Sequence, residues 1–297
     1  MPRTAILFAT ICLISLFSGA TASGASISVQ DDSGHVVTLP APAQRIVSLA
    51  PHVTELLFDI GAGSQIVAAS DYSDYPEAAK RLPRVGGVFG LDLERIAAAR
   101  PDLVIAWQSG ASAAQLETIE RLGIPVFRSE PKQLDDIATS LERFGALSGH
   151  ALDAAIAASE FRAQVVTLGN MYSGKKPVRV FYQVWNAPLM TIGGPHLIAK
   201  VIKLCGGVNV FDRLDALAPV VDAEAVIAAD PQVIVGASAS GGDERDLAIW
   251  RRWPRIAAVR NRHLVVLDAA IITRHTPRIL IGARQLCDSI DAARRNR

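Results

Sequence analysis

The sequence predicts two Rossmann-like α/β lobes, each with a mostly parallel sheet, joined by one long rigid helix. Strands and helices alternate along the chain, the same order restarts near residue 174, and a helical segment lies between the two stretches. Such alternation is typical of a parallel sheet covered by helices on both faces. Half of the 297 residues are apolar, which is enough to build two compact cores. We expect the lobes at residues 26–150 and 174–297, and the linking helix at residues 151–173.

Residues 1–25 have the layout of a secretory signal peptide. An apolar run at residues 5–17 is followed by small residues, and this run is too short to cross a bilayer comfortably. Two small-residue motifs, at residues 20–22 and 23–25, fit cleavage by a signal peptidase. Cys12 lies inside the apolar run and lacks the small neighbours of a lipoprotein cleavage site. We therefore expect an exported, soluble mature protein without a lipid anchor.

Cys205 and Cys287 are the two cysteines that remain after signal cleavage. An even number of cysteines in an exported chain favours a disulfide between them. The alternative is a pair of buried thiols that act as small apolar side chains.

The first lobe begins with an apolar strand that leads into a helix. Residues 45–49 are typical of a buried strand, and residues 53–60 of a helix that ends at Gly61. The same order then recurs up to residue 128. Further strands are expected at residues 66–69, 103–106 and 125–128, with helices at residues 93–99 and 113–122.

The second lobe repeats this pattern after the long helix. Residues 151–172 contain no proline and have apolar residues at helical spacing, which indicates one helix of roughly 30 Å. A strand at residues 178–184 opens the second lobe. Further elements are expected as a helix at residues 196–204, strands at residues 233–235 and 263–267, and a last helix at residues 277–293.

A repeated segment occurs once in each lobe. Residues 91–105 and residues 221–235 align at a constant offset, and each contains a short helix with an acidic start, a proline turn and a buried strand. Glu94 and Glu224 occupy equivalent positions, where a carboxylate in the first turn is stabilised by the helix dipole. That stabilisation does not explain why both lobes have one. Paired carboxylates at the tips of two lobes would also dock symmetrically on a two-fold partner with basic residues.

Two lobes bridged by one helix predict a cleft, because ligands of open α/β sheets bind beyond the carboxyl ends of the strands. Aromatic residues form only 6% of the chain, yet four of them follow expected strands: Tyr72, Tyr75, Trp107 and Trp185. Each of them alone is more typical of a core than of a binding surface. Their shared placement favours a cleft for a large, flat and partly apolar molecule.

Two histidines have more than one interpretation. His275 lies beside Arg274 in the last expected cleft loop, where its imidazole could coordinate cobalt or iron or could simply be solvated. His52 and Glu55 are three residues apart at the start of a helix. Two groups alone are too few for a metal site, so a surface or capping role is favoured for this pair.

The chain lacks the motifs of several classes of protein. Residues 236–241 do not fit the nucleophile elbow of hydrolases, and neither a phosphate loop nor a dinucleotide fingerprint occurs. With 30 basic and 29 acidic residues, the chain has no basic field for a nucleic acid. We therefore expect a monomer that is not an enzyme and has no resident cofactor, no metal site and no nucleic-acid partner.

Several motifs together resemble the periplasmic vitamin B12-binding proteins of bacterial corrinoid importers. The similarity covers nearly the whole mature chain, residues 44–290. Siderophore and heme binders of the same superfamily share the single motifs, whereas the combination of Ser-Asp-Tyr-Pro with Ala-Trp is more specific. The motifs lie at residues 45–51, 72–76, 93–96, 101–107, 204–211 and 277–278.

This resemblance implies a class III periplasmic binding protein that captures cobalamin or a related corrinoid and delivers it to an ABC permease dimer at the inner membrane. It implies that Glu94 and Glu224 contact arginines of the permease and that Tyr72 lines the corrin site. It also implies that Cys205 and Cys287 form a disulfide.

The chain departs from the family pattern in the expected cleft. Val88, Ala218 and the pair Ile271 and Ile272 stand where the family has aromatic residues. The remaining aromatic residues would then stack on the corrin: Tyr72, Phe89, Trp107 and Trp185. The last cleft loop completes the expected ligand-binding set with Ile271, Ile272, Arg274 and His275.

Two alternative functions remain open at this point. The first is the binding of heme or a ferric siderophore, with Tyr75 as an iron-ligating phenolate and Arg274 bound to carboxylates. The second is a corrinoid-processing enzyme of the same fold, against which the missing acid, base and metal residues argue.

Overall fold

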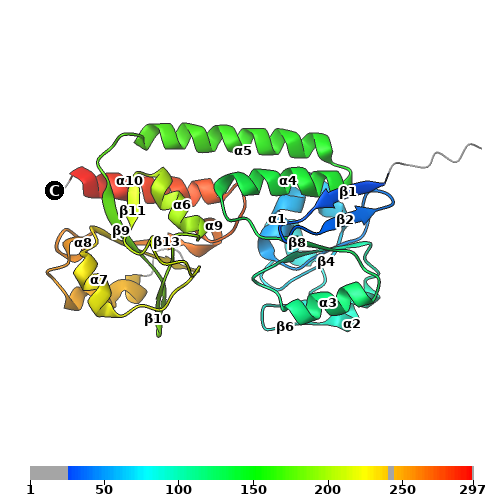
Figure 1. Cartoon of the computed structure of the whole chain (residues 1–297), viewed down its shortest axis with the longest axis horizontal. Coiled ribbons are helices and arrows are strands. Elements are labelled where there is room, and N and C mark those ends of the chain that lie inside the picture. Colours follow the sequence, from blue (N-terminus) through cyan, green and yellow to red (C-terminus); the bar gives the residue numbers. More distant parts are fainter. Residues whose placement is uncertain (1–25, 240–243, 296–297) are drawn as a thin grey trace, which may run out of the picture.

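A computed structural model describes residues 26–239 and 244–295 of the chain (Figure 1). Two α/β lobes lie next to each other beneath a layer of long helices. The expected signal peptide, residues 1–25, lies outside the described residues.

The N-terminal lobe contains a four-stranded parallel sheet in the order β4-β3-β7-β8. Successive side chains of a strand point to opposite faces, so Ile105 packs toward α1 and α4 while Val104 packs toward α2 and α3. Both faces are therefore buried, as the apolar strands require. The elements are β3 (Ile46–Ser48), α1 (Pro51–Asp59), β4 (Ile66–Ala69), α2 (Leu93–Ala98), β7 (Leu103–Trp107), α3 (Ala113–Arg121), β8 (Val126–Ser129) and α4 (Leu134–Ser148).

The C-terminal lobe contains a five-stranded sheet in the order β10-β9-β12-β13, with β11 paired to β9. All its pairings are parallel except that of β10 with β9. Val235 packs toward α6 and α10, and Ile234 packs toward α7 and α8. The elements are β9 (Val178–Asn186), β10 (Leu189–Thr191), α6 (Leu197–Leu204), β11 (Gly207–Asn209), α7 (Ala223–Ala229), β12 (Val233–Ser238), α8 (Ala257–Arg260), β13 (Leu264–Asp268), α9 (Ala269–Ile272) and α10 (Ile279–Arg295).

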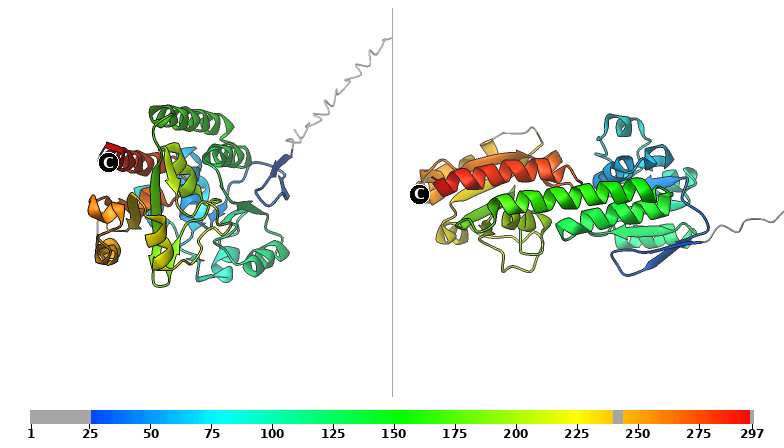
Figure 2. Two further views of the ribbon diagram at one scale, coloured as in Figure 1. Left: turned by 60° about the vertical axis from the view of Figure 1, so that its left-hand side comes forward. Right: turned by 90° about the horizontal axis from the view of Figure 1, so that it is seen from above.

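Helix α5 (Ala151–Tyr172) links the lobes and packs on α4, α6 and α10. Seen from above, α4, α5 and α10 run next to one another over both sheets (Figure 2). Gly145 of α4 allows close approach to α5, because a Cβ there would lie 2.3 Å from the Cβ of Ala154. One continuous apolar core consequently extends from the first lobe through these helices into the second.

The predicted fold class, two α/β lobes joined by one long helix, is confirmed, whereas the lobe boundaries at residues 150 and 174 stay predictions. The disulfide between Cys205 and Cys287 is present and joins the end of α6 to α10. Several expected bounds were wrong: α1 begins at Pro51, β9 continues to Asn186, β12 continues to Ser238, and the last helix begins at Ile279. The sequence did not predict α4, β10, β11, α8 or α9. Smaller elements that it also did not predict are β1 (Ile27–Gln30), β2 (Val36–Leu39), η1 (Ala62–Gln65), η2 (Glu77–Arg81), β5 (Gly86–Gly87), β6 (Gly90–Leu91) and η3 (Glu244–Arg252).

Candidate functional site

A cavity of about 670 Å³ lies between the lobes at the carboxyl ends of both sheets. Tyr72 follows β4 and Trp107 ends β7 on one side, while Tyr182 of β9 and Ala237 of β12 line the other side. Binding sites of open α/β sheets lie at this edge, because the loops that follow the strands converge there. The structure thus places a binding cavity where the sequence predicts a cleft.

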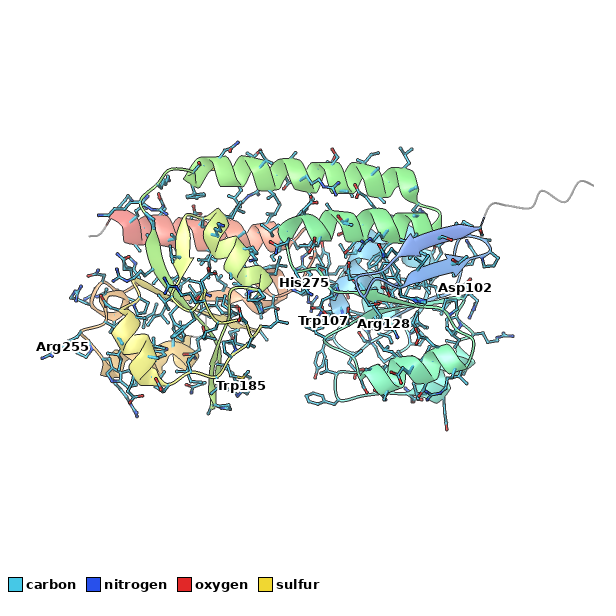
Figure 3. The ribbon with its side chains drawn as sticks, viewed as in Figure 1. Asp102, Trp107, Arg128, Trp185, Arg255 and His275 are labelled. Carbon is cyan, nitrogen blue, oxygen red and sulfur yellow. A yellow bond between two sulfur atoms is a disulfide. The ribbon has the colours of Figure 1, made fainter. Side chains whose placement is uncertain are left out.

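His52, Trp107 and His275 pack together in this cavity. The ring of Trp107 meets those of His52 and His275 edge to face, with centroid distances of 5.8 and 5.9 Å, and the two imidazoles are 5.4 Å apart. His52 directly follows the β3 loop at the start of α1, and His275 lies in the loop between α9 and α10. Trp107 and His275 both face the space between the lobes (Figure 3).

Three cavity histidines, His52, His196 and His275, are held in their neutral form, and we call them the histidine cluster. Burial lowers the pKa of His275 to about 4, and nearby His196 adds to this effect. Burial also lowers the pKa of His196 to about 4. The pKa of His52 is lowered by burial first, and then by His275 and Arg274. Near pH 7 the cluster is therefore an uncharged set of hydrogen-bonding groups.

Arg274 lines the cavity with its charge already paired. Its Nη1 donates to Oε1 of Glu55 at 2.6 Å, and its Nη2 lies 2.6 Å from Oδ1 of Asp74. Nη2 also donates to the carbonyl oxygen of Tyr72 at 3.3 Å. These contacts fix the guanidinium against the N-terminal lobe and offset its positive charge.

Glu55 corrects the expectation of a surface or capping role for the pair His52 and Glu55. Its side chain is 1% exposed and accepts hydrogen bonds from Thr276 at 3.1 Å and Arg278 at 3.2 Å, in addition to Arg274. His52 is buried as well. Both side chains contact the second lobe: Glu55 pairs with two of its arginines, and the ring of His52 packs against His275.

Trp107 is held in place by Glu130, which follows β8. The indole Nε1 donates to Glu130 Oε1 at 3.4 Å, and the backbone N–H of Ser109 donates to Oε2 at 2.8 Å. The hydroxyl of Ser109 also donates to Glu130 at 3.1 Å. The carboxylate thereby fixes both the ring and the turn that follows β7.

The other expected aromatic residues lie around the cavity or away from it. Phe89 is fully exposed on the turn between β5 and β6 and shares a neighbouring groove with Tyr72. The ring of Tyr75 lies 3.7 Å from the guanidinium of Arg278, outside the lining of the cavity. Trp185 lies on the far part of β9, where its Nε1 donates to the carbonyl oxygen of Ala187, and it borders a separate small pocket (Figure 3).

Ile271 and Ile272 do not line the cavity, which corrects the expectation for the last cleft loop. Both belong to α9 and are 8% and 0% exposed, packed in the core of the C-terminal lobe. Ala269 at the start of α9 lines the cavity, as do Thr273, Arg274 and His275 after the helix. The two isoleucines at the end of α9 are buried instead.

Among the lining residues that were not expected ligand contacts, three have polar rings: His52, Tyr182 and His196. His52 follows β3, as the rule that predicted the cleft requires, whereas Tyr182 lies within β9 and His196 between β10 and α6. His52 could have been found in this way, since it directly follows an expected strand. His196 required knowledge of the β10 strand, which the sequence pattern did not indicate.

The repeated segment has the same local structure in both lobes. Asp92 and Asp222 are the N-caps of α2 and α7, and their carboxylates accept backbone N–H groups at 2.9 and 2.7 Å. Glu94 and Glu224 follow in the first turns and are exposed. The buried side chain two residues later, Ile96 in one copy, anchors each helix.

Residues 26–239 and 244–295 contain no cluster of three or more His, Cys, Asp or Glu side chains that could hold a metal ion. In the same ranges, none of the helices has the length and apolar character needed to span a bilayer.

A cavity between two α/β lobes, bridged by a helix and lined by aromatic rings, neutral histidines and a paired arginine, defines a ligand-capturing protein of the two-lobed binding class. The chain belongs to the periplasmic binding protein family, whose model matches residues 46–271. The resemblance of its motifs to those of periplasmic vitamin B12-binding proteins is confirmed by the similar proteins described next.

The chain is similar to proteins named vitamin B12-binding protein in two genera. It is 38% identical to that of Vibrio campbellii over 257 residues, which cover 86% of this chain and 92% of the relative. It is 39% identical to that of Yersinia pestis over 256 residues, which cover 86% and 89%.

Solved structures of periplasmic binding proteins share this fold. The periplasmic vitamin B12 binding protein BtuF of Vibrio cholerae superimposes with a TM-score of 0.78 at 36% identity, covering 85% of this chain and 98% of that one. A periplasmic heme binding protein from Pseudomonas aeruginosa has a TM-score of 0.69 at 25% identity, covering 85% and 91%.

Proposed function

We propose that this chain captures cobalamin or a related corrinoid in the periplasm and delivers it to an ABC import permease. The cavity between the lobes carries this proposal, because it joins the edge-on ring of Trp107 to the uncharged histidine cluster. A large ligand with an apolar macrocycle and neutral amide side chains fits such a lining. The relatives named for vitamin B12 support the same ligand.

Heme is the competing ligand, and the charges of the cavity argue against it. A heme would bring two carboxylates, but the guanidinium of Arg274 is already bound to Glu55 and Asp74. Tyr75, the candidate iron ligand, lies beside Arg278 and outside the cavity lining. Lys132 also lines the cavity, but its side chain is exposed, so water screens its attraction for a carboxylate.

Ligand retention tests this proposal directly. The purified mature protein is mixed with cyanocobalamin or with heme, passed through a desalting column, and its visible spectrum is recorded. We expect one equivalent of cobalamin to stay with the protein and heme to be lost. Trp107→Ala should weaken cobalamin retention, while the exposed Leu152→Ala on α5 should not. Retention of heme with loss of cobalamin would contradict the proposal.

We further propose that the protein acts as a soluble monomer and docks on the permease dimer through Glu94 and Glu224. Both carboxylates are exposed at equivalent helix starts of the two lobes, so one face presents two similar acidic sites. A two-fold partner with basic residues matches this arrangement. The combined change Glu94→Ala and Glu224→Ala should abolish transport and leave cobalamin binding intact. An equal loss of binding would place the glutamates in the cavity or the fold instead.

A further inference from the structure

The cavity contains hydrogen-bonding atoms that the protein itself does not use. Nε2 of His52, Nδ1 of His275 and the hydroxyl of Tyr182 are buried and have no hydrogen-bond partner among the described residues. His52 and Tyr182 are 5% and 2% exposed, and all three residues line the cavity. Buried polar groups are nearly always paired in folded proteins, so unpaired groups that line a cavity are available to bind a ligand.

These atoms include both hydrogen-bond donors and hydrogen-bond acceptors. Nδ1 of His196 accepts the backbone N–H of Ile198 at 3.1 Å, so the neutral ring carries its proton on Nε2 and offers a donor. The hydroxyl of Tyr182 is a second donor. Neutral His52 and His275 each have one acceptor nitrogen and one N–H donor.

The histidine cluster adds no charge to this part of the cavity, and Lys132, which also lines the cavity, is exposed to solvent. Burial favours the uncharged form of all three histidines, and the adjacent Arg274 is paired with two carboxylates. A carboxylate placed here would find no unpaired guanidinium and would face imidazole lone pairs. A carboxamide would instead donate its N–H to a lone pair and accept from Nε2–H or from the tyrosine hydroxyl.

We propose that His52, Tyr182, His196 and His275 form a subsite that binds carboxamide groups of the ligand and rejects carboxylates in their place. This proposal rests on the proposed function and specifies it, since it selects amide-bearing corrinoids over their acid forms. It also separates corrinoids from ligands whose macrocycle carries free carboxylates.

The test compares cyanocobalamin with derivatives in which one side-chain amide is hydrolysed to a carboxylic acid. Affinities are measured at pH 7.5 by quenching of tryptophan fluorescence, for the wild type and for Tyr182→Phe, His275→Phe and His196→Asn. Tyr182→Phe removes only a hydroxyl, and asparagine can still cap α6. His35→Ala, on the exposed turn after β1, is the matched control.

We expect the wild type to prefer the amide over at least one acid derivative by tenfold or more. The ratio should fall toward one in the cavity variants and stay unchanged in His35→Ala. Strong cobalamin binding with a ratio near one, or a ratio that no cavity variant changes, would overturn this inference alone. A wild-type protein that retains no cobalamin would overturn the proposed function, and the inference with it.

Discussion

At the level of single residues, the carboxylate of Glu55 connects the two lobes beside the cavity. It lies on α1 of the first lobe, yet its three side-chain partners, Thr276, Arg274 and Arg278, belong to the second. A buried charge of this kind is tolerated only because opposite charges and donors surround it. The same contacts hold the segment that places His275 in the cavity lining.

Replacing Glu55 by alanine should therefore destabilise the protein strongly. The change leaves two partly buried arginines without their shared partner, and breaking a buried pair in this way costs about 3–5 kcal/mol. Glu77→Ala is the control, because Glu77 is 78% exposed in its pair with Lys80, and such pairs contribute up to about 1 kcal/mol. Urea unfolding followed by circular dichroism measures both. Equal losses in the two variants would show that the interlobe network adds no stability.

The predictability of site residues depended on how they reach the cavity. Trp107 and His275 follow expected elements in the chain, and the rule about strand ends was enough to place them. Ile271 and Ile272 lie one turn earlier, in a four-residue helix that the sequence pattern did not show. Their apolar character reports burial in the lobe core, not ligand contact, and only the position of α9 separates the two possibilities.

At the level of elements, the repeat divides its two acidic positions between different tasks. Asp92 and Asp222 satisfy backbone N–H groups at the starts of α2 and α7, so they serve the fold. Glu94 and Glu224 are not the N-caps of these helices, and both side chains are exposed. A residue of positive φ follows each helix, Arg100 after α2 and Asp230 after α7.

Removing the caps should lower stability, and removing the glutamates should not. Asp92→Ala and Asp222→Ala each lose a capping bond, which costs about 1 kcal/mol. Glu94→Ala and Glu224→Ala change exposed side chains and should stay within about 0.5 kcal/mol. Thermal and urea unfolding of the four single variants test this division. A glutamate variant as unstable as its neighbouring cap variant would assign both residues to the fold.

Elements were predictable where one period governed a whole segment. Helix α5 matches its expected range because residues 151–172 keep helical spacing throughout. Helix α4 has the same kind of spacing in Leu134, Ile137 and Leu141, so its signal was present in the chain. The end of strand β9 could not be predicted, because its last residues extend beyond the pairing with β12 and pair only with the short strand β10.

At the level of the whole molecule, the disulfide joins the end of α6 to α10 within the C-terminal lobe. It encloses a sequence separation of 82 residues, and the chain-entropy model then gives a stabilisation of about 4 kcal/mol. Cys205→Ala with Cys287→Ala should lose most of this amount in urea unfolding, and added reductant should no longer affect the variant. A variant as stable as the oxidised wild type would show that the packing of α6 on α10 suffices alone.

The histidine cluster makes the stability of the whole molecule depend on pH. In the unfolded chain His196 and His275 bind protons near the ordinary pKa of 6.5, but in the folded protein only near 4. Between these values the unfolded chain holds more protons, so the free energy of unfolding falls as the pH falls from 6.5 toward 4. Each histidine contributes at most about 3 kcal/mol to this loss, which is complete below the folded pKa.

Urea midpoints at pH 7.5 and pH 4.5 should therefore differ less in the variant His275→Asn than in the wild type. Asparagine cannot be protonated in this range, so the variant loses the part of the pH dependence that comes from His275. His196 and the carboxylates still titrate in the same range. His35→Asn is the matched control, since His35 is exposed and should leave the pH dependence unchanged. A wild-type slope in the His275 variant would mean that carboxylates alone govern the loss at low pH. The cavity histidines would then bind the ligand without affecting folding.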